Sequence, residues 1–318
     1  MPELAVGWAR PDGLPAAAAP DTDVHLRLDF KVDLWLTLAP LRHGRGDPTI
    51  RFDSRGAWRT TRTVAGAATL RLEPLGTELR VRAWGPGAER AVAAVPRLVG
   101  AEDDPSLLRL PRGPLRELAA RFADLRFGRT DAVMESLVPA IIEQKVIGAM
   151  AQRSYRLLVE RYGEDAPGPA GLRLPPRPET LARVPYHALH PLGLEQRRAL
   201  TLARASSRAA WLESASTMTA ESAGARLRSF PGVGAWTAAE TVRTAFGDPD
   251  AVSAGDFHTP NLVAWALAGE PRADDARMLE LLEPFRGQRA RLVRLLELSG
   301  LRAPRFGPRL AVRSFEHF

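Results

Sequence analysis

The chain has 318 residues, and its 44 Lys and Arg residues exceed its 37 Asp and Glu residues to give a formal net charge of +7. The length is enough for two domains, and the positive charge favours a polyanionic partner, although biased arginine usage gives the same excess. The absence of cysteine excludes disulfides, thiol nucleophiles, cysteine zinc sites and iron–sulfur clusters. No N-terminal segment has the pattern of an export signal and no apolar run is long enough to span a bilayer, so we expect a cytoplasmic protein.

The first part of the chain predicts an antiparallel sheet. Residues 1–22 are rich in Pro, Ala and Gly and indicate a loosely ordered lead-in. Beyond them, apolar and polar residues alternate in short segments that are separated by turns with glycine or proline, which is typical of half-buried strands. These segments are 24–30, 34–38, 50–52, 58–63, 69–72 and 79–83. A helical pattern follows over residues 88–99.

The remaining sequence predicts helices almost throughout. Apolar residues at helical spacing run over 132–162, interrupted at Glu143-Gln144-Lys145, which we interpret as a loop between two helices. A proline-rich surface loop is expected over 167–178, and helices over 197–212 and 221–229. The fold class is therefore α+β, with three predicted segments. These are the lead-in at 1–22, an antiparallel-sheet α/β domain at 23–110 and a helical domain at 111–318.

The segment from Phe230 to Glu240 combines a tight turn with a helix start. Gly232 and Gly234 have no side chains, so a phosphate can approach the backbone there, and the N–H groups that open the next helix point at such an anion. A compact connection between two helices with no ligand uses the same residues, so the turn alone leaves both interpretations open.

Asp256 lies just before a predicted helix N-terminus. Thr259 followed by Pro260 is typical of a helix start, since threonine can cap the helix and proline suits its first turn. One interpretation of Asp256 is an accessory cap or a solvated loop carboxylate. The other is a negative charge that the helix dipole stabilises beside a developing positive charge.

Together, the glycine turn, the helix after it and Asp256, which follows Gly234 by 22 residues, resemble the signature of the helix-hairpin-helix DNA glycosylases. The similarity covers about residues 113–300 and is to the branch that removes alkylated purines. It implies that the hairpin at Gly232, Val233 and Gly234 holds the DNA backbone, with a structural monovalent cation at Gly232 and Gly234 in some members. It also implies that Asp256 assists cleavage of the N-glycosidic bond. The predicted sheet resembles the small α/β domain that precedes the helical core in this branch and that is itself similar to one half of the TATA-binding protein.

The resemblance extends to residues 138–147, which match the family segment that supplies a wedge to the DNA duplex. The wedge position falls on Lys145, whereas relatives of this branch often have an apolar residue there, so Gln144 or Val146 is expected to share the role. We also assign Thr237, in the first turn of the hairpin helix, to the residues that contact DNA.

Three residues are candidates for the pocket that receives the base. A cationic alkylated purine favours the face of an aromatic ring, which Trp236 offers, although core packing is the rival interpretation. Glu240, one turn further on, pairs either with the cationic base or with an arginine. Phe285 matches a segment that carries an aromatic pocket residue, again with core packing as the alternative.

Trp236 also occupies the position at which the family's bifunctional members have a nucleophilic lysine. Lys31 and Lys145 are the only lysines of the chain, and neither is well placed to attack the sugar. We therefore predict a monofunctional enzyme that uses water and has no abasic-site lyase activity.

The C-terminal segment is rich in arginine. We expect Arg305 and Arg309 to lie along DNA phosphates, with a solvated tail as the alternative. His187 and His190 lie between two prolines without a nearby carboxylate cluster, so no catalytic metal is expected.

The sequence thus predicts a DNA glycosylase for flipped-out alkylated purines of the 3-methyladenine type, acting in base excision repair without a required cofactor. Its partner would be double-stranded DNA that contains damaged bases, and a monomer suffices for the task. In a bacterium the protein would associate with the nucleoid. Two alternatives stay open: a catalytically silent protein that binds DNA lesions, and a glycosylase for another lesion such as oxidised guanine or uracil.

Overall fold

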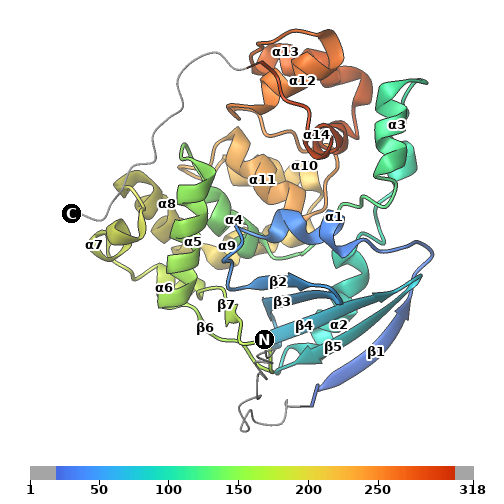
Figure 1. Ribbon diagram of the computed structural model, residues 1–318. Helices are drawn as coiled ribbons and strands as arrows, with labels where there is room; N and C mark the ends of the chain where they lie inside the picture. The colour runs from blue at the N-terminus through green and yellow to red at the C-terminus, as the bar shows by residue number, and fades with distance from the viewer. Residues whose placement is uncertain (1–18, 305–318) are drawn as a thin grey trace, which may run out of the picture.

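The computed structural model describes residues 19–304, and Figure 1 shows a sheet at one end of a mainly helical body. In this part of the chain the main sheet has five antiparallel strands in the order β1-β5-β4-β3-β2. The strands are β1 (Thr22–Arg27), β2 (Ile50–Asp53), β3 (Gly56–Thr63), β4 (Gly66–Leu75) and β5 (Glu78–Trp84). The α+β class is confirmed, and the strands fall on the alternating segments that predicted them, with one exception.

The exception is residues 34–38, which form the helix α1 (Leu34–Leu38) instead of a strand. Asp33 has extended backbone angles, and its side chain accepts a hydrogen bond from the Leu36 N–H at 2.9 Å, as a helix cap does. The apolar residues Leu34 and Leu38 pack into the core of the sheet. Because these positions are four apart, they suit a single turn of helix as well as they suit a strand.

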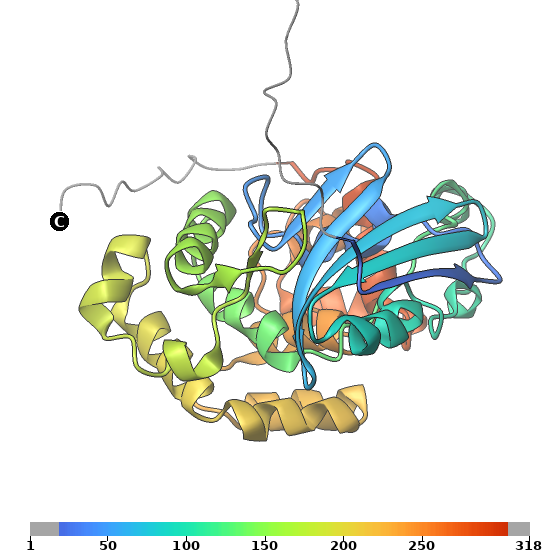
Figure 2. The same ribbon diagram turned by 90° about the horizontal axis from the view of Figure 1, so that it is seen from below.

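The core of the sheet lies between the strands and the helix α2 (Ala88–Leu98), which Figure 2 shows along one face of the sheet. In β5, the side chains of Leu79, Val81 and Ala83 are buried and alternate with more exposed neighbours. They pack with residues of α2 such as Val95. The alternation of apolar and polar residues in the sequence therefore reflects a sheet with one buried face, as expected when only one side is covered.

The helical body begins with α3 (Pro114–Arg121), α4 (Val133–Ile142) and α5 (Gly148–Tyr162). The predicted loop at 143–145 is confirmed between α4 and α5. The expected surface loop at 167–178 contains a strand, since β7 (Arg173–Leu174) pairs with β6 (Glu164–Asp165). Next come α6 (Pro178–Leu181), α7 (Tyr186–Leu189), α8 (Gln196–Ser207), α9 (Ala209–Glu213), α10 (Ala220–Arg228) and α11 (Ala235–Ala245).

The last helices form a second helical core. They are α12 (Thr259–Ala268), α13 (Asp275–Leu282) and α14 (Arg289–Leu298), and Figure 1 shows them together, away from the sheet. Their hydrophobic cluster includes Val263, Met278 and Leu292, with Leu115 and Leu118 of α3 packed against it. A separate and larger cluster joins α4, α5, α8, α10 and α11. The candidate site lies where α11 of the larger cluster faces α14 of the smaller one.

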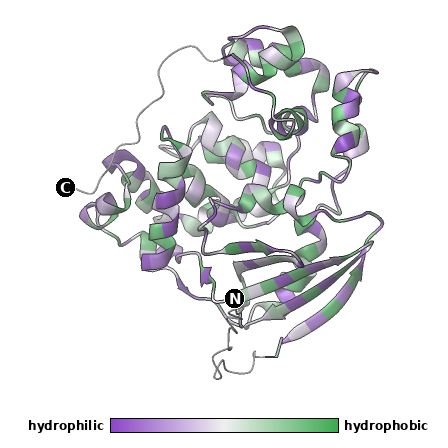
Figure 3. Cartoon of the chain, viewed as in Figure 1, coloured by the Kyte–Doolittle hydropathy of each residue, from purple (hydrophilic) through white to green (hydrophobic). Residues whose placement is uncertain are grey.

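Most of the helices carry both hydrophilic and hydrophobic residues, as the hydropathy colouring of Figure 3 shows. Along the described residues, no helix combines the length and the apolar character that a membrane span requires.

Candidate active site

A cavity of about 190 Å³ lies between the two helical cores, and we call it the Asp256 cavity. Three of the residues predicted for the site, Trp236, Glu240 and Asp256, line it together. The wall is completed by α14 and by the loop before α12. The further lining residues are Arg243, Ala251, Val252, Ser253, Thr259, Ala290, Val293 and Glu297.

Asp256 is held at the N-terminus of α12 through one carboxylate oxygen. Its Oδ1 accepts hydrogen bonds from the N–H groups of His258 and Thr259, both at 2.7 Å, and from the Thr259 hydroxyl at 2.9 Å. The N-cap residue of α12 is His258, and the acceptor for the first N–H groups of the helix comes from Asp256 and not from Thr259, whose hydroxyl donates to Asp256. Within residues 19–304, Oδ2 has no hydrogen-bond partner. The side chain thus serves as a helix cap and still presents an oxygen at the cavity.

A glycine sets the loop that carries this carboxylate. Gly255 has a φ of +93°, a left-handed conformation that side chains rarely adopt. A Cβ atom built there would lie 3.8 Å from Cβ of Trp236, so the loop runs close to α11. The turn brings Asp256 to the cavity that Trp236 also lines.

Glu240 is tied to two neighbours within the cavity wall. Its carboxylate forms an ion pair with Arg243 and accepts a hydrogen bond from the Ser253 hydroxyl. Burial raises the pKa of the Glu240 carboxyl above its ordinary value, against the lowering effects of Arg243 and Ser253. The pairing of Glu240 with an arginine, one of its two predicted interpretations, is therefore present in the structure.

The charges around the Asp256 cavity are unbalanced. Three carboxylates, those of Asp256, Glu240 and Glu297, line it with the single guanidinium of Arg243. Glu297 has a further partner in Arg294, at 3.0 Å, which does not line the cavity. Such a site favours a positively charged occupant.

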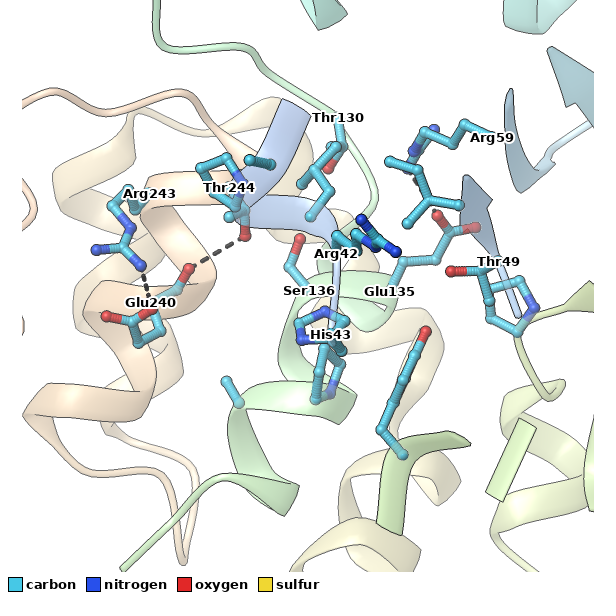
Figure 4. A pocket seen from close by; sticks show the side chains of 18 of the residues that line it. Arg42, His43, Thr49, Arg59, Thr130, Glu135, Ser136, Glu240, Arg243 and Thr244 are labelled. Atoms are coloured by element: carbon cyan, nitrogen blue, oxygen red, sulfur yellow. Dashed lines mark hydrogen bonds and ion pairs between the residues drawn. The ribbon is translucent and has the colours of Figure 1, made fainter. Parts of the chain in front are cut away.

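Glu240 and Arg243 also line a second cavity of about 190 Å³, on the side of the sheet. Figure 4 shows them on α11 at one side of this sheet-side cavity, with Arg59 and Glu135 at the other. Arg59 and Glu135 form an ion pair with an N–O distance of 3.0 Å that links β3 to α4. The Glu240–Arg243 ion pair on α11 therefore lines both cavities.

His43 connects the sheet-side cavity to the predicted wedge loop. Its Nδ1 lies 3.1 Å from Oε1 of Glu143, the residue before Gln144, and its ring packs 4.7 Å from that of Tyr155. Burial opposes the charged imidazolium, but the hydrogen bond and the charge of Glu143 raise the pKa of His43 above its usual value. The position of the wedge loop therefore depends on a contact from the sheet domain.

The predicted hairpin joins α10 to α11. Gly232 has a φ of +93°, and a Cβ atom there would meet Oγ1 of Thr201 at 2.4 Å, so only glycine fits without a shift. The side chain of Val233 is buried, and its N–H donates to the Phe230 carbonyl at 3.0 Å inside the turn. Val233 therefore holds the turn in shape and has no spare amide for a phosphate.

The start of α11 offers the free amides that an anion needs. Gly234 is the N-cap, is exposed and has no side chain to cap the helix. The N–H groups of Ala235 and Trp236 open the helix, where backbone donors have no intrahelical partner. The hairpin thus presents backbone donors at an uncapped helix N-terminus.

Gln144 links the wedge loop to the hairpin. Its Nε2 donates to the Gly232 carbonyl and to the Thr237 hydroxyl, both at 2.9 Å. Thr237 is 2 % exposed, so its hydroxyl holds Gln144 and does not reach the surface as a DNA contact would require. Two loops that are far apart in the sequence are joined by one amide.

Lys145 is the exposed residue at the tip of that loop. It has a φ of +53°, and outside the glycines only Asp131 shares a positive φ in the described chain. Such strain is typical of functional loops. Val146 is half-buried and packs against the larger helical core, which leaves Lys145 as the outward-pointing member of the predicted wedge.

Phe285 is not brought to the site. It is half-buried against the hydrophobic cluster of α12, α13 and α14, and it lines neither of the two cavities. Core packing, the rival interpretation, describes its position, and Ala290 and Val293 of α14 form the wall in its place.

Arg305 and Arg309 lie outside the described residues. Of the arginines that precede them, Arg289 pairs with Asp250, and Arg291 is 2 % exposed and pairs with Asp103. The basic character read from this segment is therefore largely neutralised within α14.

Sequence reasoning missed several residues of the site. Arg243 lies seven residues after Trp236 on the same face of α11, so its helical spacing could have revealed it. Ser253 and Glu297 lie on other segments, the loop before α12 and α14, so no local spacing in the sequence relates them to Trp236. Phe257, directly after Asp256, is 79 % exposed, an unusual exposure for an aromatic residue beside a candidate catalytic group.

Among residues 19–304, no cluster of three or more His, Asp or Glu side chains could hold a metal ion.

The fold is similar to that of solved DNA glycosylases. The sequence is homologous to DNA-3-methyladenine glycosylase 2 of Escherichia coli (strain K12). The two are 29% identical over 205 residues, which is 63% of this chain and 70% of that protein. No protein-family model matches the chain.

Two solved structures are similar over nearly their whole length. The 3-methyladenine DNA-glycosylase from Archaeoglobus fulgidus has a TM-score of 0.74 at 21% identity, covering 87% of this chain and 98% of that one. The 8-oxoguanine glycosylase/lyase of Clostridium acetobutylicum has a TM-score of 0.68 at 14% identity, covering 90% and 99%. These likenesses establish the fold.

Proposed function

We propose that this chain is a monofunctional DNA glycosylase that hydrolyses the N-glycosidic bond of alkylated purines. The observation that carries the proposal is the position of Asp256, which is fixed at the α12 N-terminus and lines a cavity with Trp236 and Glu240. The homologous DNA-3-methyladenine glycosylase 2 supports the same class of activity. Such an enzyme would act on double-stranded DNA in the cytoplasm, at the nucleoid of a bacterium.

The charge of the Asp256 cavity favours a cationic base. Alkylation of a purine at a ring nitrogen leaves the base positively charged, and three carboxylates with one guanidinium attract such a group. The ring of Trp236 adds an aromatic wall that suits a cation. Neutral lesions would gain less from the same site.

Asp256 would act at the sugar. When the bond between C1′ and the purine nitrogen breaks, the electron pair leaves with the base, and the sugar becomes oxocarbenium-like. The negative charge of Asp256 would stabilise this sugar and accept a proton from the water that attacks C1′. A cationic base needs no proton to depart, so a single carboxylate suffices.

A base must leave the duplex to reach this cavity. The free amides at the α11 N-terminus would hold a phosphate of the flipped strand. Lys145, at the exposed tip of its loop, would enter the gap with Gln144 behind it, and its charge would face phosphate or base edges instead of an apolar stack.

Strand cleavage is not part of the proposal. Trp236 cannot form a Schiff base, Lys31 is paired with Asp124, and Lys145 lines neither cavity. We expect the abasic strand to stay intact after base release.

A structural monovalent cation at the hairpin fits the carbonyl chemistry of this turn. The Gly232 carbonyl already accepts a hydrogen bond from Gln144, which leaves one of its lone pairs for a cation. An effect of K⁺ on DNA affinity beyond that of ionic strength would support such a site, and equal affinity in matched Li⁺ and K⁺ buffers would argue against it.

The test is a base-release screen over duplexes with single defined lesions, analysed by chromatography of the free bases. We expect release of alkylated purines, loss of that release in Asp256→Asn, and no release of uracil. Asp274→Asn is the matched control, because Asp274 caps α13 through the Arg277 N–H at 2.9 Å and does not line the Asp256 cavity.

Lesion-specific binding without release of any base would favour a silent binding protein. Release of 8-oxoguanine in preference to alkylated purines would overturn the choice of lesion.

A further inference from the structure

One face of α11 carries Trp236, Glu240 and Arg243, at spacings of four and three residues. Residues at this spacing lie above one another on a helix. All three line the Asp256 cavity, so a base that rests against Trp236 has Glu240 and Arg243 at one of its edges. This inference rests on the proposed function and concerns which purine the cavity takes.

The carboxylate of Glu240 keeps two acceptor positions. Its Oε1 is used by the Ser253 hydroxyl and its Oε2 by Nη2 of Arg243. Each carboxylate oxygen can accept two hydrogen bonds, so one position remains on each oxygen. The side chain is 17 % exposed, so an occupant of the cavity can reach it.

The guanidinium of Arg243 keeps donors. Nη2 pairs with Glu240, while Nη1 has no partner among residues 19–304 and Nε is buried without one. Buried donors without partners are rare in proteins. Glu240 and Arg243, which are hydrogen-bonded to each other, thus place free acceptors on one side chain next to a free donor, Nη1, on the other.

We infer that this pair reads the Watson–Crick edge of guanine, so that alkylated guanines are the preferred substrates. That edge presents the N2 amino group and N1–H as donors and O6 as an acceptor, which complements two carboxylate acceptors and a guanidinium donor. Ser253, in the loop before α12, holds Glu240 in place through its hydroxyl.

Adenine fits this arrangement poorly. Its edge presents an N6 amino donor and an N1 acceptor, and the lone pair of N1 would face the carboxylate lone pairs. A buried polar group that meets no partner loses free energy, so the mismatch would discriminate against adenine. The cationic charge that alkylation confers is the same for both bases and gives no preference.

A series of free bases tests the inference with the unaltered protein. 7-Methylguanine, 7-methylhypoxanthine and 7-methyladenine compete for the Asp256 cavity in an equilibrium binding assay. 7-Methylhypoxanthine lacks only the N2 amino group, so we expect it to bind about tenfold more weakly than 7-methylguanine. We expect 7-methyladenine to bind about a hundredfold more weakly. Equal affinities for the three bases would overturn the inference.

A variant tests the same point during base release from DNA methylated with dimethyl sulfate. Glu240→Gln should slow release of 7-methylguanine about tenfold more than release of 3-methyladenine, because the amide offers one acceptor instead of two. Glu135→Gln, at the sheet-side cavity only, is the control and should leave the ratio unchanged.

The outcomes separate the inference from the proposed function. No base release by the unaltered protein would refute the proposed function, while the binding series would still report on the edge. Base release with equal slowing of both lesions in Glu240→Gln would leave the function standing and remove the role in guanine recognition.

Discussion

Replacing Asp256 with Asn and with Ala separates its two roles. Asn keeps an amide oxygen at the Oδ1 position, so it can still accept hydrogen bonds from the His258 and Thr259 N–H groups and cap α12. Asn and Asp are about equal as caps, whereas Ala costs about 1 kcal/mol. We therefore expect Asp256→Asn to unfold at nearly the wild-type temperature and Asp256→Ala to unfold about 2–4 °C lower.

The catalytic effect should not follow this order. Both variants lose the negative charge at the cavity, so both should lose on the order of a thousandfold in the single-turnover rate of base release. The rates come from quenched-flow release of 7-methylguanine, and the stabilities from calorimetry on the same samples. A rate for Asp256→Asn within a few fold of wild type would refute the reasoning, as would equal destabilisation of the two variants.

Three further perturbations test the loops around the site. Gln144→Ala removes two hydrogen bonds to the hairpin, and we expect roughly tenfold to a hundredfold slower base release with little change in unfolding temperature, measured in parallel. Wild-type kinetics would show that the link is dispensable. Phe257→Ala should leave stability unchanged to within about 0.5 kcal/mol, because this side chain is 79 % exposed. It should weaken binding to lesion DNA about tenfold in a fluorescence-anisotropy titration, through loss of aromatic contact with the bases, and unchanged affinity would place the ring outside the interface. Glu143→Gln removes the partner that raises the pKa of His43, and a raised pKa contributes stability below about pH 6.5 that is lost as the pH rises through the folded-state value. Denaturant titrations from pH 5 to 9 should thus show the wild type's advantage over Glu143→Gln shrinking with pH, and an advantage that grows with pH would contradict this sign.

The sheet could be predicted strand by strand because each strand buries one face, so that apolar and polar residues alternate along it with a period of two. Leu34 and Leu38 misled the prediction, since an apolar pattern of only five residues fits a strand or one turn of helix. What decides between them is the capping bond of Asp33, a local feature that periodicity does not record.

The candidate site was predictable where its residues share one local element. Trp236, Glu240 and Asp256 follow from the hairpin and the next helix start. The opposite wall comes from α14, where Val293 and Glu297 reach the cavity only because the small C-terminal core folds back on α11. Phe285 was assigned by resemblance, and its packing among leucines shows that a matching position in a sequence does not fix the direction of a side chain.

The side-chain amide of Gln144 links the wedge loop to the hairpin and so fixes the distance between them. In the proposed complex with DNA, a strand held at the hairpin would meet Lys145 at a fixed distance, so the protein would bind the backbone and fill the vacated space in one step. DNA that is too stiff to open at that distance could be held but not entered. Undamaged duplex would then be released before any base reached Asp256.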